Sequence, residues 1–79
     1  MQLTLYVRHK CHLCTQMHRE LLAAGARRDF SVALVDIDAD AELVARYGHK
    51  VPVLVGGGEE ICHYFLDEHQ LDAFLSRTP

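Results

Sequence analysis

Two cysteines near the N-terminus, Cys11 and Cys14, are the side chains in this sequence best suited to chemistry. They belong to residues 7–14 (VRHKCHLC), which follow a strand-like apolar run and precede a pattern with helical spacing. The pair therefore lies where a strand passes into a helix. Because the first N–H groups of a helix lack partners within it and its dipole favours negative charge there, a cysteine at this place is biased toward the thiolate. The thiolate attacks disulfides and binds metals.

The helical pattern distinguishes the two sulfur atoms. Cys14 opens an apolar stripe with the spacing of one helix face, so we expect it to point inward. Cys11 precedes the stripe and should be exposed. An accessible thiolate backed by a covered thiol is what dithiol exchange needs, because the first attacks a disulfide and the second resolves the mixed disulfide. The stripe consists of Cys14, Met17, His18, Leu21, Leu22 and Gly25.

Length, composition and charge narrow the class of protein. We expect residues 1–79 to form one domain, and 24% charged residues without a low-complexity run predict a globular chain. A formal charge of -3 with one basic cluster, Arg27-Arg28, argues against nucleic acid as a partner. We expect no membrane segment and no signal peptide, hence a cytoplasmic location. In a reducing compartment, a close cysteine pair favours a catalytic or metal-binding role over a structural one.

The first half of the chain predicts a strand, a helix and a second strand. The first strand covers residues 3–7 and the helix runs from about His12 to Ala24, with Gly25 as the left-handed residue that closes it. Residues 30–35 form a nearly continuous apolar run, which is typical of a strand covered on both faces in a parallel sheet. Together these elements predict a right-handed crossover unit.

The second half predicts a short helix, a strand pair and a last helix. Asp38 or Asp40 can cap a helix to about Tyr47, which Gly48 ends. Because proline cannot donate a backbone hydrogen bond, Val51-Pro52 should stand at the start of the third strand, residues 53–55. Glycines 56–58 then predict a tight turn to a fourth strand over residues 61–65. The last helix follows Asp67 and Gln70, which form a capping pair.

This order of elements resembles the thioredoxin fold in its minimal, glutaredoxin-like form, over essentially the whole chain. The closest local matches are residues 5–14 (LYVRHKCHLC), residues 35–40 (VDIDAD) and Val51-Pro52. The resemblance implies an α/β fold with the order β-α-β-α-β-β-α. It also implies a four-stranded mixed sheet, with strands in the order 2-1-3-4 and helices on both faces.

The resemblance further implies the activity of a glutaredoxin-like disulfide reductase, a thiol-disulfide oxidoreductase. In the family the proline before the third strand is cis and lies against the dithiol, which matches Pro52. We accordingly expect Cys11 to attack, Cys14 to resolve, and Val51 to offer its N–H and C=O to an extended substrate. Arg8 matches the basic residue that meets the glutathione carboxylate. The expected partners are a disulfide-containing protein or a glutathione mixed disulfide, with glutathione as co-substrate, no bound cofactor and a monomeric chain.

Two stretches depart from the family pattern. The dipeptide between the cysteines is His12-Leu13, where glutaredoxins typically have Pro-Tyr and thioredoxins Gly-Pro. A histidinium at His12, together with Lys10, would favour the thiolate of Cys11. Residues 64–67 (YFLD) stand where glutaredoxins usually carry Gly-Gly-x-Asp to hold glutathione. Asp67, with Glu68, is then the expected acceptor for the glutathione amine.

Other interpretations of the cysteines remain open. Cys11 and Cys14 could bind zinc or share an iron-sulfur cluster between two chains, although a complete zinc site wants four ligands. The chain could also be a binding adaptor that keeps the fold without turnover. We expect Cys62 to be a buried, inert thiol and His18 to be packed in the core. His9 either tunes the thiolate or faces solvent.

A cluster of aspartates follows the second strand. Asp36, Asp38 and Asp40 have the chemistry of a hard-cation site, and Asp36 could accept a proton near Cys14. Capping and solvation at the strand end explain them more simply.

Overall fold

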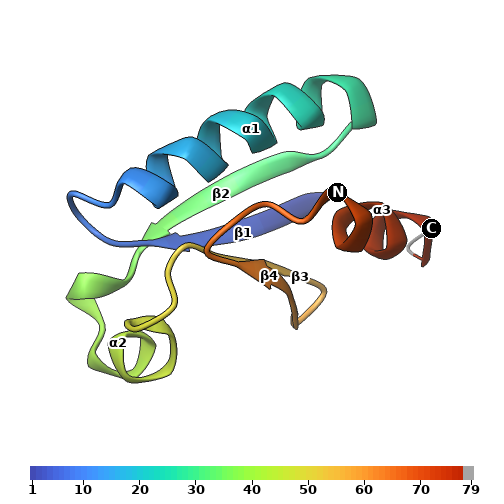
Figure 1. Cartoon of the computed structure of the whole chain (residues 1–79). Coiled ribbons are helices and arrows are strands. Elements are labelled where there is room, and N and C mark those ends of the chain that lie inside the picture. The colour runs from blue at the N-terminus through green and yellow to red at the C-terminus, as the bar shows by residue number, and fades with distance from the viewer. Residues whose placement is uncertain (78–79) are drawn as a thin grey trace.

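The computed structural model describes residues 1–77, which form a mixed sheet and three α-helices (Figure 1). The strands pair in the order β2-β1-β3-β4, with β1 parallel to β2 and the other two pairs antiparallel. This confirms the expected α/β fold and its strand order. The elements are β1 (Gln2–Val7), α1 (His12–Arg28), β2 (Ser31–Asp36), the 3-10 turn η1 (Ile37–Ala39), α2 (Ala41–Tyr47), β3 (Val53–Gly56), β4 (Glu59–His63) and α3 (Glu68–Arg77).

Helices lie on both faces of the sheet, but they cover the faces unequally. Leu3 and Leu5 of β1 pack in one core cluster with Leu21 of α1 and Phe74 of α3. Because side chains alternate along a strand, α1 and α3 share this face. The other face meets the short α2, where Tyr6 stacks on Tyr47 with 4.7 Å between ring centroids. Figure 1 shows α1 along one face and α2 at one end of the other.

Helix α1 is longer than the sequence pattern indicates, and Gly25 does not close it. Asp29 has the left-handed backbone (φ 58°) and its N–H donates to the Gly25 carbonyl at 3.0 Å. Gly25 lies inside the helix because the chain turns back closely there: a Cβ at this position would be 2.6 Å from the carbonyl oxygen of Phe30. The expected burial of Leu22 was also wrong. Its side chain is 56% exposed, and the face buried against the sheet is Cys14, Met17, Leu21 and Ala24.

Strand β2 is an edge strand, contrary to the expectation that both of its faces are covered. Its side chains are exposed or half-buried throughout, and Leu34 is 51% exposed. The register pairs Leu34 with Leu5, so Leu34 lies on the α1 face, which α1 leaves partly open there. The apolar run therefore reflects the demands of β pairing rather than burial of both faces.

The turn between β3 and β4 is tighter than expected. Gly56 belongs to β3, and Gly57 and Gly58 form the turn with positive φ angles of 56° and 81°. Strand β4 consequently starts at Glu59 and ends at His63, so residues 64 and 65 lie beyond it rather than in the strand. Both of these aromatic side chains are exposed.

The caps of α2 and the N-cap of α3 were predicted correctly. Asp40 accepts hydrogen bonds from the backbone N–H groups of Glu42 and Leu43 at 2.9 and 3.2 Å, and α2 ends with Gly48 as its C-cap. Asp67 accepts from the Gln70 N–H at 3.0 Å at the start of α3. Among the helices of residues 1–77, none has the length and apolar character to cross a membrane.

The fit at Gly25 generates a stability prediction. At an exposed helix position, a Gly→Ala substitution raises the free energy of unfolding by up to about 1 kcal/mol. At Gly25 we expect Gly25→Ala to lower the free energy of unfolding instead, by about 1–2 kcal/mol, because the new methyl group meets a backbone oxygen. Urea denaturation followed by circular dichroism measures the change. Ala23→Gly, on the exposed side of the same helix, should cost only about 1 kcal/mol, and a stabilised Gly25→Ala would contradict the packing argument.

Candidate active site

A disulfide joins Cys11 and Cys14 at the start of α1, with 5.2 Å between their Cα atoms. Cys11 is the N-cap residue, with extended backbone angles (φ −108°, ψ 108°). Its Sγ accepts a hydrogen bond from the backbone N–H of Cys14 at 3.1 Å. The sulfur therefore takes the place that a side-chain oxygen occupies in an ordinary N-cap. The strand-to-helix position expected from the sequence is confirmed.

The two cysteines differ in exposure in the expected sense. Cys14 is buried, with 4% of its surface exposed, whereas Cys11 is half-buried. Cys14 belongs to the buried face of α1 with Met17, which fixes its direction. The outer sulfur is thus the one that a partner molecule can approach.

An open cavity of ≈ 580 Å³ lies beside the disulfide. Both cysteines and the exposed Leu34 contribute to it, and no carboxylate of the described chain is in its lining. A helix N-terminus favours the thiolate form of a cysteine placed there, and the part of Lys10 and His12 in tuning Cys11 stays a prediction. The basic and histidine side chains in the lining are Arg8, His9, Lys10, His12 and His18.

The peptide bond between Val51 and Pro52 is cis, as the family resemblance implied. The β1–β3 register pairs Tyr6 with Val53, so Val51-Pro52 continues past the end of β1, beside the segment that leads to Cys11. Pro52 is fully buried and Val51 is half-buried. Among residues 1–77, neither the N–H nor the C=O of Val51 has a hydrogen-bond partner.

Hydrogen bonds to β4 and to the loop after it hold the segment before Pro52 in place. Lys50 contacts Glu60 at 2.6 Å, and His63 contacts the other oxygen of the same carboxylate at 2.8 Å. The hydrogen bond from Lys50 lowers the pKa of Glu60, with a smaller contribution from His63. Tyr64 adds a hydrogen bond from its hydroxyl to the His49 carbonyl at 2.8 Å.

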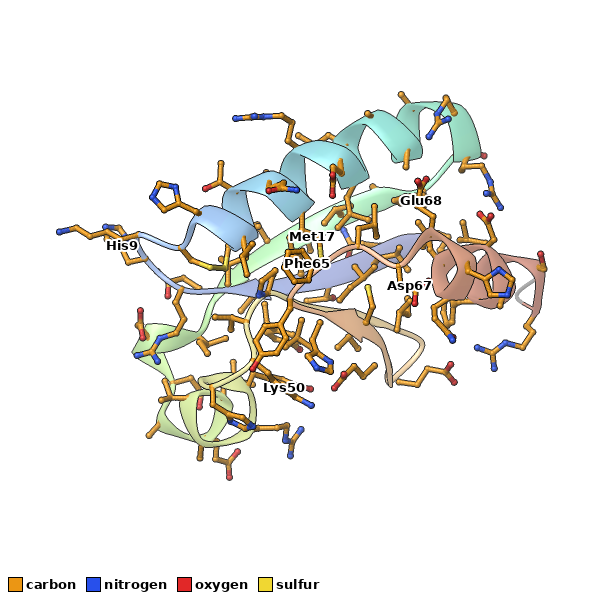
Figure 2. All side chains as sticks on the ribbon, in the orientation of Figure 1. His9, Met17, Lys50, Phe65, Asp67 and Glu68 are labelled. Carbon is orange, nitrogen blue, oxygen red and sulfur yellow. A yellow bond between two sulfur atoms is a disulfide. The ribbon has the colours of Figure 1, made fainter. Side chains whose placement is uncertain are left out.

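Arg8 and Asp67, the two residues expected to hold glutathione, already have partners within the chain. The Arg8 guanidinium pairs with Asp38 at 2.8 Å and reaches the Gly48 carbonyl at 3.4 Å, which ties the loop after β1 to α2. Asp67 caps α3, and Figure 2 shows it well away from the disulfide end of α1. Both side chains are partly or fully exposed, and their roles toward glutathione stay predictions.

The remaining candidates are arranged as structural residues. Cys62 is buried at 9% exposure, and burial raises the pKa of its thiol, as expected for an inert cysteine. Asp36 caps η1 through the Asp38 N–H at 2.9 Å, which accounts for its place after β2. His18 is half-buried rather than packed in the core, and it lines the cavity. Within the described residues, no group of three or more His, Cys, Asp or Glu side chains is placed to hold a metal ion.

Residues 49, 50 and 64 help to position Pro52, and the sequence did not predict this role. The Tyr64 N–H donates to the Pro52 carbonyl at 3.0 Å and its hydroxyl reaches His49, so the residue links two loops at once. The only signal for this was the Tyr64-Phe65 pair after the fourth strand, in place of the glycines of the family pattern.

A sequence profile of the family described as Glutaredoxin-like domain (DUF836) matches residues 2–76. The chain belongs to this glutaredoxin-like family. The family membership agrees with the thioredoxin-type fold and with the paired cysteines at the start of α1. An uncharacterized protein of Mycobacterium tuberculosis is similar, with 28% identity over 82 residues, covering 98% of this chain and 84% of that protein.

Solved structures place this glutaredoxin-like chain among thioredoxin folds. The solution structure of a Nitrosomonas europaea protein is similar with a TM-score of 0.84 and 36% identity, covering 92% of this chain and 88% of that one. A crystal structure from X. campestris has a TM-score of 0.66 and 40% identity, covering 98% of this chain and 99% of that one. Thioredoxin 1 of Thermosipho africanus, at 15% identity, has a TM-score of 0.64 over 98% of this chain and 97% of its own, and shares the fold.

The carboxylate of Glu60 generates a pH-dependent prediction. A pKa lowered by folding adds stability above the unfolded value of about 4.5, and this stability is lost as the pH falls below it. We expect Glu60→Gln to lower the free energy of unfolding at pH 7 by about 0.5 kcal/mol, the scale of a partly exposed ion pair, and by less at pH 3.5.

Denaturant unfolding of both proteins at the two pH values measures this difference. Glu20→Gln, on the exposed face of α1, is the control and should show a smaller difference at pH 7. A Glu60→Gln effect that is the same at both pH values would contradict the charge-based explanation.

Proposed function

We propose that this glutaredoxin-like protein is a thiol-disulfide oxidoreductase that reduces disulfides through Cys11 and Cys14. The observation that carries the proposal is the asymmetry of the pair. The Sγ of Cys11 lies at the N-cap of α1, where it accepts a backbone hydrogen bond, and the partner sulfur is buried one turn later. In such a pair, the accessible cysteine is stabilised as the thiolate that attacks the substrate. The buried cysteine can react only with a sulfur atom of its own chain.

The reaction takes two exchange steps. The Cys11 thiolate attacks one sulfur of the substrate disulfide, forming a mixed disulfide and releasing the other substrate sulfur as a thiolate, which takes up a proton. Cys14 then gives its proton to solvent and attacks the Sγ of Cys11, releasing the second substrate thiolate. Two electrons have passed to the substrate, and the Cys11–Cys14 disulfide has formed.

The backbone of Val51 is suited to hold the substrate during attack. Its N–H and C=O have no partner among residues 1–77, and it lies level with Arg8 when the β1–β3 register is continued. An extended segment on either side of the substrate cysteine can pair with these groups as a short strand, which is how many domains bind peptides. Pro52, which follows Val51 through the cis peptide bond, is buried.

A thiol donor must return two electrons to the Cys11–Cys14 disulfide, and we propose glutathione as this co-substrate. Arg8 and Lys10 supply positive charge for its carboxylates at the cavity. Asp67, with Glu68, is the acceptor proposed for its amine. The other partner is a protein disulfide or a glutathione mixed disulfide, and the reducing cytoplasm is the compartment in which a reductase of this kind would work. We propose that the chain acts as a monomer without a bound cofactor.

Serine substitutions of the two cysteines test the assignment. We expect Cys11→Ser to abolish disulfide reductase activity, because a hydroxyl cannot replace the attacking thiolate. Cys14→Ser should trap the mixed disulfide with a protein substrate, visible by mass spectrometry, or retain only glutathione-linked turnover. Assays with glutathione and with thioredoxin reductase as alternative donors cover both sources of electrons.

Cys62→Ala is the matched control and should keep the activity of the unaltered protein, since this thiol lies outside the site. Full activity of Cys11→Ser would exclude the proposed chemistry. If the unaltered protein shows no turnover with either donor, the oxidoreductase proposal is wrong and the binding-adaptor interpretation replaces it.

A further inference from the structure

The loop between β4 and α3 exposes an aromatic side chain, Phe65. It is 62% exposed, more than any other large apolar side chain of residues 1–77. Covering a phenylalanine ring from water is favourable, so an exposed ring is a strong contact for a partner molecule. A single exposed ring is not unusual, and its meaning depends on how it is held and where it lies.

The backbone that carries Phe65 is held in an unfavourable conformation. Tyr64 has a φ of 64°, in the left-handed region that is unfavourable for residues other than glycine. Its N–H donates to the Pro52 carbonyl at 3.0 Å and its hydroxyl to the His49 carbonyl at 2.8 Å. The next N–H, that of Phe65, donates to the His63 carbonyl at 2.8 Å. These three hydrogen bonds fix the direction in which the ring leaves the loop.

This loop lies at the proposed substrate-binding edge. The β3–β4 register pairs Val53 with His63, and the hydrogen bond from Tyr64 to Pro52 extends that pairing by one step. Phe65 directly follows this hydrogen bond, so its loop lies beside Pro52, the neighbour of Val51, whose free backbone groups we propose to bind the substrate. In the view of Figure 2, Phe65 lies between the disulfide and α3.

We propose that Phe65 determines which disulfides this protein reduces. The ring packs against a bulky apolar side chain that flanks the target cysteine in an extended polypeptide paired with Val51. The preferred substrate class is therefore a protein disulfide with apolar neighbours, and small polar disulfides gain nothing from the ring. A preorganised aromatic side chain binds at a low entropic cost, which suits a contact that sets specificity. This inference rests on the proposed oxidoreductase function.

The test compares two peptides of equal length that carry the same cysteine as a mixed disulfide. One has leucine on both sides of the cysteine and the other has serine. We expect Phe65→Ala to raise KM for the leucine peptide about 10-fold with kcat unchanged, and to leave KM for the serine peptide within about 2-fold. Phe65→Leu should restore most of the lost affinity. Leu22→Ala, which removes a side chain of similar exposure (56%) from α1, is the matched control and should change neither KM.

The outcomes separate the two proposals. If the unaltered protein reduces both peptides but Phe65→Ala changes KM for neither, or for both equally, Phe65 does not set specificity and the oxidoreductase function stands. If the unaltered protein reduces neither peptide nor any small disulfide, the oxidoreductase function is wrong, and the inference falls with it. Circular dichroism of each variant shows that the substitution has not unfolded the chain.

Discussion

The hydrogen bond from the Cys14 N–H to the Sγ of Cys11 is the interaction on which the candidate site depends. It places one sulfur at the positive end of a helix, where negative charge is favoured, and its geometry requires that α1 begin at His12. Two other elements of the fold position this hydrogen bond. Strand β1 leads into the loop before α1. The buried face of α1 packs the helix against the sheet, and this face includes Cys14 and Met17.

A second part of the proposed site comes from far along the chain. The antiparallel pairing of β1 with β3 brings Pro52 beside the end of β1, and the segment before it is held by contacts to β4 and to the loop beyond. Because these contacts involve Lys50, Glu60 and Tyr64, the shape of the substrate edge depends on residues outside the cysteine motif.

Local signals in the sequence predicted most of the helices and strands, and the family resemblance supplied the strand order. The strand before Cys11, the caps Asp40 and Asp67, and the place of Pro52 each depend on a few neighbouring residues, and all were correct. The predictions from sequence were wrong where contacts between residues far apart in the chain determine the structure. Gly25 is inside α1 because the chain returns against it at residue 30, which no local pattern reveals. The pairing of Arg8 with Asp38 and the two-loop link made by Tyr64 likewise join segments that only the folded chain brings together.

We propose that Cys11, once reduced, is a thiolate stabilised by its place at the start of α1. The rate of alkylation of the reduced protein by iodoacetamide as a function of pH, with the modified cysteine identified by mass spectrometry, tests this proposal. We expect Cys11 to react first and to reach half its maximal rate at least one pH unit below about 8.5, the pKa of an unperturbed cysteine. A midpoint at or above that value, or earlier modification of Cys14, would contradict it.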